Sequence, residues 1–289
     1  MLTRAALALV WLLRLLPLPL LAPLGRGVGI LLYLLGRERR QVVLTNLALC
    51  FPGWTDDERR RVAKAHFRSF GRSVLEHGIL WWSSRERVKR LVRIQGLENW
   101  LAVSDRPVIW LAPHFIGLDM GGVRIATEYR ALSVYSRQKD PVFDALLYHG
   151  RTRFEPQELY SRQEGVRSVI KALRRGVPFY YLPDMDFGSR DSIFVPFFGV
   201  PAATITGLSR IAKLASAVVV PTVTRQLPGG DGYVLTFYPA WRDFPSDDVA
   251  ADTRRMNAFI EERVLEMPEQ YYWLHKRFKT RPPGEAKFY

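Results

Sequence analysis

The residue types best suited to chemistry lie in one short run, residues 113–119, with the sequence PHFIGLD. Its His114 and Asp119 are five positions apart, whereas neighbours on one face of a helix are three or four apart. The two side chains can meet if His114 lies on the turn after a strand and Asp119 lies in the first turn of the following helix. A carboxylate that orients an imidazole makes it a base for a hydroxyl proton. We therefore expect His114, oriented by Asp119, to activate an alcohol.

The neighbouring residues favour this placement. An apolar, strand-like segment at residues 108–112 precedes the run, and Gly121 and Gly122 follow it. In α/β sheets, sites gather beyond the carboxyl ends of the strands. A His and an Asp at this spacing also recur by chance, so a surface histidine beside a helix-capping aspartate is the alternative interpretation.

Strand-like and helix-like segments alternate along most of the chain. This alternation predicts an α/β fold with a mainly parallel central sheet flanked by helices. The expected strands are residues 108–112, 131–135, 179–182, 217–223 and 233–238, and the main expected helices are residues 141–154, 164–174, 204–215 and 248–266. A further helix is expected from Thr55, where three acidic residues fill the first turn. No linker divides residues 37–289, so we predict one catalytic domain there.

Residues 1–36 form an apolar segment that we expect to be a helical membrane anchor. Arg14 and Arg26 interrupt it, so no uninterrupted run of about eighteen apolar residues marks a simple spanning helix. It could span the bilayer, lie within one leaflet, or be a pair of buried core helices; a secretory signal is disfavoured because no cleavage pattern closes the run. Arg37, Arg39 and Arg40 follow directly and favour the cytoplasmic side.

The charge balance predicts an anionic partner. Lys and Arg number 42 against 28 Asp and Glu, a formal net charge of +14. Nucleic acid, acidic lipid, a phosphorylated substrate or an acidic carrier protein would each suit this surplus. Cys50 is the only cysteine, and the chain has no HExxH, CxxC or GxxxxGK[ST] motif. We therefore expect no metal site, no cofactor and no nucleotide hydrolysis.

Several residues downstream are candidates for substrate binding. Arg151, Arg153 and Arg162 carry guanidinium groups that could bind phosphate, although a solvated basic face is the alternative. Asp184 ends a predicted strand, where a carboxylate could orient an arginine or a substrate. The Phe and Pro residues of the stretch 181–204 could form an apolar surface for an acyl chain, or they could be ordinary core aromatics.

Four motifs together resemble one known family, the late acyltransferases of lipid A biosynthesis within the lysophospholipid acyltransferase superfamily. They are PHFIGLD, PDMDFG, FVPFFG and PEQYYWLHKRFKTRP, and the similarity runs from residue 46 to residue 282. The resemblance implies that the family's HxxxxD/E dyad falls on His114 and Asp119, its Gly-Arg-x-Arg motif on Arg151 and Arg153, and its Pro-Asp motif on Asp184. The Tyr135-Ser136-Arg137 segment departs from the Tyr-Arg-Pro pattern of several members.

The resemblance also implies an activity and a location. Such enzymes act at the cytoplasmic face of the inner membrane of Gram-negative bacteria. They move a fatty acyl group from acyl carrier protein to a hydroxyl of a Kdo-modified lipid A precursor. We expect direct transfer, because Cys50 lies far upstream and no serine stands in a GxSxG elbow.

Two other functions are compatible with parts of the sequence. One is acyl transfer to another membrane lipid, such as a phosphatidylinositol mannoside or a phosphoglycerol acceptor, although the EGTR-like motif typical of the glycerol-phosphate branch is missing from the sequence. The other is an inactive, basic protein that binds membrane or nucleic acid, which would show steeply salt-dependent binding. We expect no nucleic-acid partner.

Overall fold

A central sheet of seven strands organises the chain. The computed structural model describes residues 2–161 and 165–289. Across the sheet the strand order is β1-β9-β8-β2-β5-β3-β4. The strands are β1 Val92–Gln95, β2 Val108–Leu111, β3 Ala131–Tyr135, β4 Gln157–Ser161, β5 Phe179–Tyr181, β8 Val218–Gln226 and β9 Tyr233–Phe237. A separate antiparallel pair consists of β6 Ser192–Phe197 and β7 Val200–Ile205.

The sheet is mainly parallel, which confirms the predicted fold class. Strands β8, β2, β5, β3 and β4 pair in parallel. Strand β9 runs antiparallel to β8, and β1 pairs with β9 in parallel. The parallel β2 is buried at every position, as expected for a strand covered on both faces. The carboxyl ends of these parallel strands therefore meet at one edge of the sheet.

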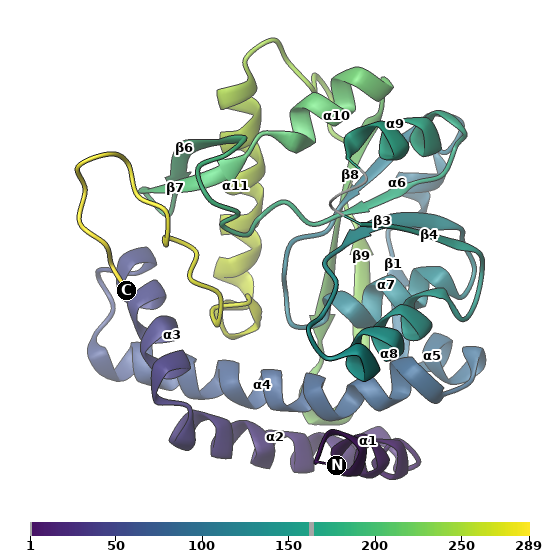
Figure 1. The fold of residues 1–289 in the computed structure, drawn as a ribbon, viewed down its shortest axis with the longest axis vertical. Helices are drawn as coiled ribbons and strands as arrows, with labels where there is room; N and C mark the ends of the chain where they lie inside the picture. Colours follow the sequence, from purple (N-terminus) through teal and green to yellow (C-terminus); the bar gives the residue numbers. More distant parts are fainter. Residues whose placement is uncertain (1, 162–164) are drawn as a thin grey trace.

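Helices cover both faces of the sheet (Figure 1). They are α1 Leu2–Leu13, α2 Leu18–Leu35, α3 Arg37–Cys50, α4 Asp56–Trp82, α5 Arg85–Leu91, α6 Leu97–Leu101, α7 Leu118–Ala126, α8 Pro141–Thr152, α9 Val166–Arg174, α10 Gly207–Ala215 and α11 Val249–Glu266. Alternate residues of β2 divide the core: Ile109 packs with α9, α10 and α11 on one face, and Trp110 packs with α6 and α7 on the other.

Most of the predicted elements appear near their expected places. The predicted helix over residues 204–215 begins only at Gly207, because residues up to Ile205 pair with β6. The predicted helix over residues 164–174 is observed from Val166, and residue 164 lies outside the described residues. Strand β4, at the edge of the sheet, was not predicted.

Helix α4 is a long support across one side of the molecule. It begins with a capping box, in which the Thr55 hydroxyl accepts from the Glu58 backbone N–H and the Glu58 carboxylate accepts from the Thr55 backbone N–H. Helix α2 lies against it at very short range. A Cβ added to Gly29 would lie 2.1 Å from the Phe67 carbonyl oxygen, and one added to Gly71 would lie 2.3 Å from the Gly29 nitrogen. The contact therefore requires glycine on both helices.

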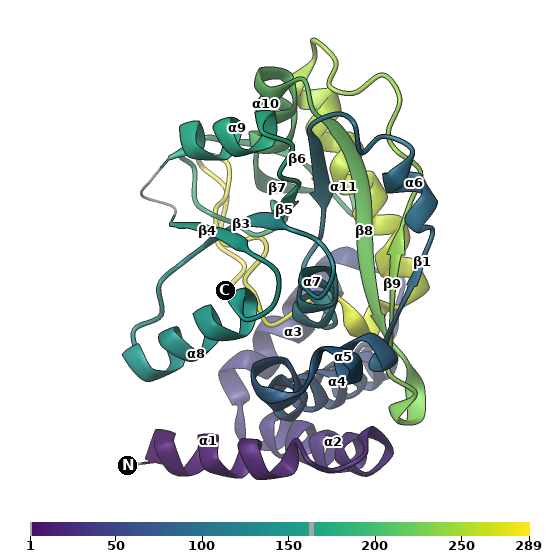
Figure 2. The same cartoon turned by 90° about the vertical axis from the view of Figure 1, so that its right-hand side faces the viewer.

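The N-terminal helices α1 and α2 form an outer layer beneath α4 (Figure 2). Among the described residues, α2 is the helix long and apolar enough to cross a membrane. The structure packs α2 against α4, and large apolar side chains remain exposed on this layer: Leu9, Trp11, Leu12, Leu15, Leu20, Leu24, Ile30, Leu31, Leu32, Leu34 and Leu35. The separation of residues 1–36 as a membrane anchor stays a prediction.

Candidate active site

His114 lies on the loop that connects β2 to α7, as the sequence predicted. The loop is fixed by the C-terminal part of the chain: the backbone N–H of Ile116 donates to the Gln270 carbonyl at 2.8 Å, and the N–H of Tyr272 donates to the His114 carbonyl at 2.9 Å. The imidazole is therefore presented by a loop with little freedom to move.

The carboxylate that contacts the His114 ring is Asp184. His114 Nδ1 lies 2.7 Å from Asp184 Oδ1, and the His114 backbone N–H donates to Asp184 Oδ2 at 3.0 Å. This pairing follows from the order of the strands, because β2 and β5 are parallel neighbours with Leu111 opposite Tyr181. His114 lies just after the end of β2, and Asp184 lies just after the end of β5. The expectation that Asp119 orients His114 is corrected accordingly.

Asp184 is suited to hold a charge in this position. Asp184 is 1% exposed, and burial alone would raise the pKa of its carboxyl group. The charge of His114 and the two hydrogen bonds from His114 outweigh that effect and lower the pKa. Asp184 was predicted to bind substrate; in the structure it contacts His114 and the side chain of Tyr271.

The contact with Asp184 determines which ring nitrogen of His114 can act as a base. An ionised carboxylate only accepts hydrogen bonds, so Nδ1 carries the proton. In the neutral imidazole, Nε2 then holds the free lone pair. His114 also lines a large cavity, so a base and a space for substrate occur together.

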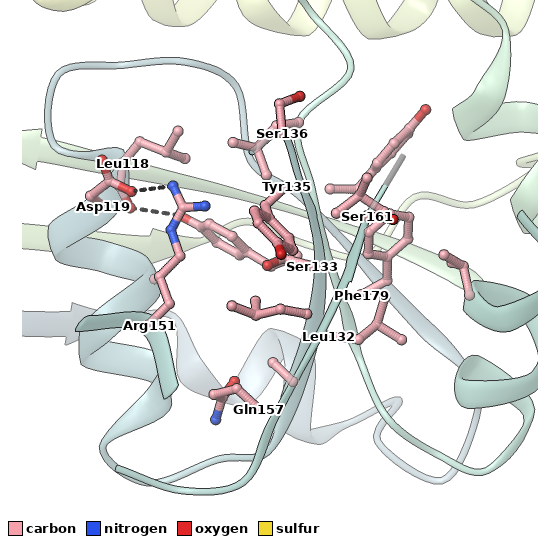
Figure 3. Close-up of a pocket in the computed structure, with 18 of the residues that line it drawn as sticks. Leu118, Asp119, Leu132, Ser133, Tyr135, Ser136, Arg151, Gln157, Ser161 and Phe179 are labelled. Atoms are coloured by element: carbon pink, nitrogen blue, oxygen red, sulfur yellow. Dashed lines mark hydrogen bonds and ion pairs between the residues drawn. The ribbon is translucent and has the colours of Figure 1, made fainter. Parts of the chain in front are cut away.

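Asp119 lies in the first turn of α7 and also lines the cavity, but its partners are cationic. Its Oδ1 accepts from Arg151 Nη2 at 3.1 Å, and its Oδ2 lies 3.3 Å from Nε2 of His77. Burial would raise the pKa of Asp119, but the charges of Arg151 and His77 and their hydrogen bonds lower it well below its usual range. Figure 3 shows Arg151 and Asp119 meeting at one side of the cavity.

The other predicted binding arginines are placed differently. Arg153 is directed to the end of α4, where its Nε donates to the Leu80 carbonyl at 2.7 Å and its guanidinium covers the Phe154 ring at 4.0 Å. Burial lowers its pKa to about 10, and it is not among the described cavity-lining residues. The structure therefore shows Arg153 in contact with α4 and Phe154, and its predicted contact with substrate stays a prediction. Arg162 lies outside the described residues.

The cavity has a volume of about 520 Å³, within the usual range for small-molecule sites. It opens where two neighbouring strands separate: β3 and β5 pair only at Leu132–Phe179 and Ser133–Tyr180, whereas β3 continues along β4 to Tyr135. Side chains from both faces of the sheet therefore reach one space. Most of its wall is apolar, with Leu118, Val123, Leu132, Val134, Leu159, Val169, Phe179 and Ile211 among its lining.

The aromatic stretch proposed as an acyl-chain surface contributes to this wall only in part, because Phe187 lines the cavity. Phe197 is fully buried in the core, and none of the phenylalanines at 194–198 is among the described residues that line the cavity. The alternative interpretation, ordinary core aromatics, describes Phe197. In the C-terminal motif, His275 Nε2 accepts from the Asp186 backbone N–H at 2.9 Å, so it holds the loop that carries Asp184.

No motif marked His77, which lies in α4 and is distant from the other site residues along the chain. Asp184 was predicted as a site residue, but with a role in binding substrate. Because parallel strands end at one edge of the sheet, its contact with His114 could have been predicted from the order of the strands. Within residues 2–161 and 165–289, no group of three or more His, Cys, Asp or Glu side chains could hold a metal ion.

Comparison with known proteins identifies the family. Residues 1–280 match the family model described as bacterial lipid A biosynthesis acyltransferase. This chain belongs to that family. It is 35% identical to the lipid A biosynthesis lauroyltransferase of Escherichia coli, over 100% of this chain and 94% of the relative.

Other relatives carry different acyl groups in their names. The palmitoleoyltransferase of Escherichia coli is 31% identical over 100% of this chain and 94% of its own length. The myristoyltransferase of Escherichia coli is 34% identical over 94% of this chain and 83% of its own length. Acyl transfer in lipid A biosynthesis is thus shared across relatives that are named for chains of different length.

Proposed function

We propose that this lipid A acyltransferase moves a fatty acyl group from acyl carrier protein to a hydroxyl of a Kdo-modified lipid A precursor, with His114 as the general base. The observation that carries the mechanism is the contact between His114 Nδ1 and Asp184 at 2.7 Å beside an apolar cavity of about 520 Å³. It leaves Nε2 with the lone pair on a residue that lines the cavity.

The reaction that this arrangement supports is a direct transfer. His114 Nε2 takes the proton from the acceptor hydroxyl, and the oxygen attacks the carbonyl carbon of the donor thioester. The C–S bond breaks as the tetrahedral intermediate collapses, and the departing sulfur receives the proton from the imidazolium. Asp184 holds the ring and stabilises the imidazolium that forms during the attack.

Charge that develops on the carbonyl oxygen needs a nearby donor. Arg151 lines the cavity, and its salt bridge to Asp119 holds the guanidinium in place. A pre-positioned cation acts strongly where an apolar wall excludes water. We assign Arg151 this role, and the same guanidinium could also meet a phosphate of the acceptor.

The apolar outer layer supports action at a membrane. Leu31, Leu34 and Leu35 are exposed on α2, which packs on α4, and α4 also contacts α7 and α8 of the site. This continuity supports anchoring by residues 1–36 at the inner membrane, with the catalytic domain, residues 37–289, on the cytoplasmic face. The excess of basic residues suits both an acidic carrier protein and a phosphorylated lipid.

The test is acyl transfer by the purified full-length chain in detergent. Acyl-acyl carrier protein is the donor, and three acceptors are compared: a Kdo-modified lipid A precursor, a phosphatidylinositol mannoside and lysophosphatidic acid. We expect mass spectrometry to find one added acyl group on the lipid A precursor. Transfer only to one of the other two acceptors would overturn the acceptor assignment.

The donor is tested in the same assay by replacing acyl-acyl carrier protein with the matching acyl-coenzyme A. We expect transfer from the carrier protein to be clearly faster at equal donor concentration. Equal or faster transfer from the coenzyme A thioester would contradict the donor assignment, while the acceptor result would stand on its own.

A further inference from the structure

His77 makes two contacts that a neutral imidazole cannot satisfy together. Its Nδ1 lies 2.5 Å from the Ser73 carbonyl oxygen, and its Nε2 lies 3.3 Å from Asp119 Oδ2. Both oxygens accept hydrogen bonds, because one is a backbone carbonyl and the other belongs to a carboxylate. Each ring nitrogen must therefore carry a proton, which describes the imidazolium form.

The surroundings of His77 hold the ring in this orientation. The side chain is 18% exposed, and its ring lies 5.4 Å from the Trp81 ring, measured between centroids. The charged groups that face it come from three helices: Glu76 on α4, Asp119 on α7 and Arg151 on α8. Glu76 is itself bound to Arg72 at 2.9 Å, which leaves Asp119 as the carboxylate that His77 contacts.

His77 and Arg151 approach Asp119 from opposite helices and contact different oxygens. Arg151 binds Oδ1 at 3.1 Å and His77 binds Oδ2. A carboxylate held at one oxygen can rotate about its terminal bond, whereas one held at both is fixed. The direction of the Arg151 guanidinium in the cavity therefore depends on a contact made from α4.

We propose that His77 is a positioning residue that, as an imidazolium, fixes Asp119 and thereby directs Arg151 into the acyl-transfer cavity. The proposal rests on the proposed function, because it assigns Arg151 a part in acyl transfer. His77 itself does not line that cavity among the described residues. It acts through Asp119.

The contact also makes the site sensitive to alkaline pH. Burial would lower the pKa of His77, but the hydrogen bond and charge of Asp119, with the bond to Ser73, raise it above its ordinary value. The imidazolium is complete below this pKa and is lost as the pH rises through it. Loss of one N–H breaks either the bond to Ser73, which orients the ring, or the bond to Asp119, so the neutral ring no longer holds Asp119 from a fixed position.

The first experiment measures the ionisation of His77 directly and needs no substrate. Nuclear magnetic resonance follows the Cε1 carbons of the five histidines through a pH titration of the full-length chain, and loss of one signal in His77→Gln assigns His77. We expect a pKa above the ordinary value of about 6.5, and a clear fall in Asp119→Asn. A His77 pKa at or below the ordinary value, or one unchanged in Asp119→Asn, would overturn the proposal.

The second experiment measures acyl transfer across pH. We expect kcat to fall by about ten- to a hundredfold in His77→Ala, with the unfolding midpoint used to confirm folding. His77→Gln keeps an uncharged donor, so it should recover part of the rate and remove the decline that begins at the His77 pKa in the unmodified enzyme. His149→Gln, on the exposed side of α8, is the matched control and should keep both rate and pH profile.

The two experiments separate failure of the proposal from failure of the proposed function. Unchanged kcat and unchanged pH profile in His77→Gln and His77→Ala would refute the positioning role even if the titration shows an imidazolium. Absence of acyl transfer by the unmodified chain would refute the proposed function, and the titration would still decide whether His77 holds Asp119 as an imidazolium.

Discussion

Asp184 lies 2.7 Å from the Nδ1 atom of His114, although 70 positions separate the two residues in the chain. The contact is made because β2 and β5 are neighbouring parallel strands that end together. In the neutral His114 ring it places the proton on Nδ1 and leaves the lone pair on Nε2. Asp119, the nearer residue in sequence, binds Arg151 and His77 instead.

Removal of the His114 side chain should abolish most of the acyl transfer while the fold is retained. General-base catalysis typically contributes about a hundred- to ten-thousandfold, so His114→Ala should lose activity in that range. The side chain is 18% exposed and is not part of the hydrophobic core, but its removal leaves the buried Asp184 carboxylate with fewer partners, so the unfolding midpoint should fall while the protein remains folded. Near-normal turnover by a folded His114→Ala enzyme would contradict the mechanism.

Replacement of Asp184 should impair the chemical step more than substrate binding. Asp184→Asn keeps the shape but removes the charge that stabilises the imidazolium, and its amide can present N–H to Nδ1 and favour the wrong tautomer. We expect kcat to fall by about a hundredfold or more, with little change in KM. Glu158→Gln, which changes the ion pair between the partly buried Glu158 on β4 and Arg175, serves as the control. A fall in Asp184→Asn confined to KM would contradict the assigned role.

The stability of the protein should decrease in acid through Asp119 and Asp184. The folded pKa of each carboxyl group is lowered, so each contributes stability above its unfolded pKa of about 3.9 that is lost as the pH falls. Chemical unfolding at a series of pH values from about 6 to about 3 measures this dependence. The slope should be shallower in Asp119→Asn, and an unchanged slope would contradict the inferred ionisation.

A larger side chain in the cavity should shift the preferred acyl chain to a shorter one. Ser133 lines the cavity beside Tyr180, and Ser133→Phe would fill part of the space. Each methylene that can no longer be buried should cost about 0.8 kcal/mol, or roughly fourfold in kcat/KM. The measurement is a competition among acyl-acyl carrier proteins of graded length.

The control for this change is Ser104→Phe, at an exposed position away from the cavity. It should leave the chain-length preference unchanged. If Ser133→Phe lowers the rate equally for every acyl length, the cavity does not measure the acyl chain.

Charged residues on the outer layer should weaken membrane binding. Leu31, Leu34 and Leu35 are 57%, 59% and 81% exposed on α2, and Glu at these positions would lose apolar contact with lipid and repel anionic headgroups. We expect a triple Leu→Glu variant to bind phosphatidylglycerol vesicles at least tenfold more weakly in co-sedimentation. Leu214→Glu and Leu265→Glu, exposed on other helices, are matched controls. Equal weakening by the controls would contradict a specific role for α2.

Local sequence determined most of the elements and the place of His114. The apolar segment before Pro113 and the glycines after Asp119 indicated a strand, a turn and a helix, and alternation of such units along the chain indicated a mainly parallel sheet. The family motifs marked Arg151 and Asp184 as site residues. The predictions of strands, helices and fold class succeed because periodicity and turn chemistry are properties of neighbouring residues.

Only the tertiary structure decided how the site residues pair. The order of strands places Asp184 beside His114, and the packing of α4 against α7 and α8 brings His77 to Asp119. Arg153 follows Arg151 by two positions, yet it contacts the end of α4 instead of the cavity. Hydrophobic periodicity tells which face of an element is buried, but the neighbour that covers that face depends on contacts between distant parts of the chain.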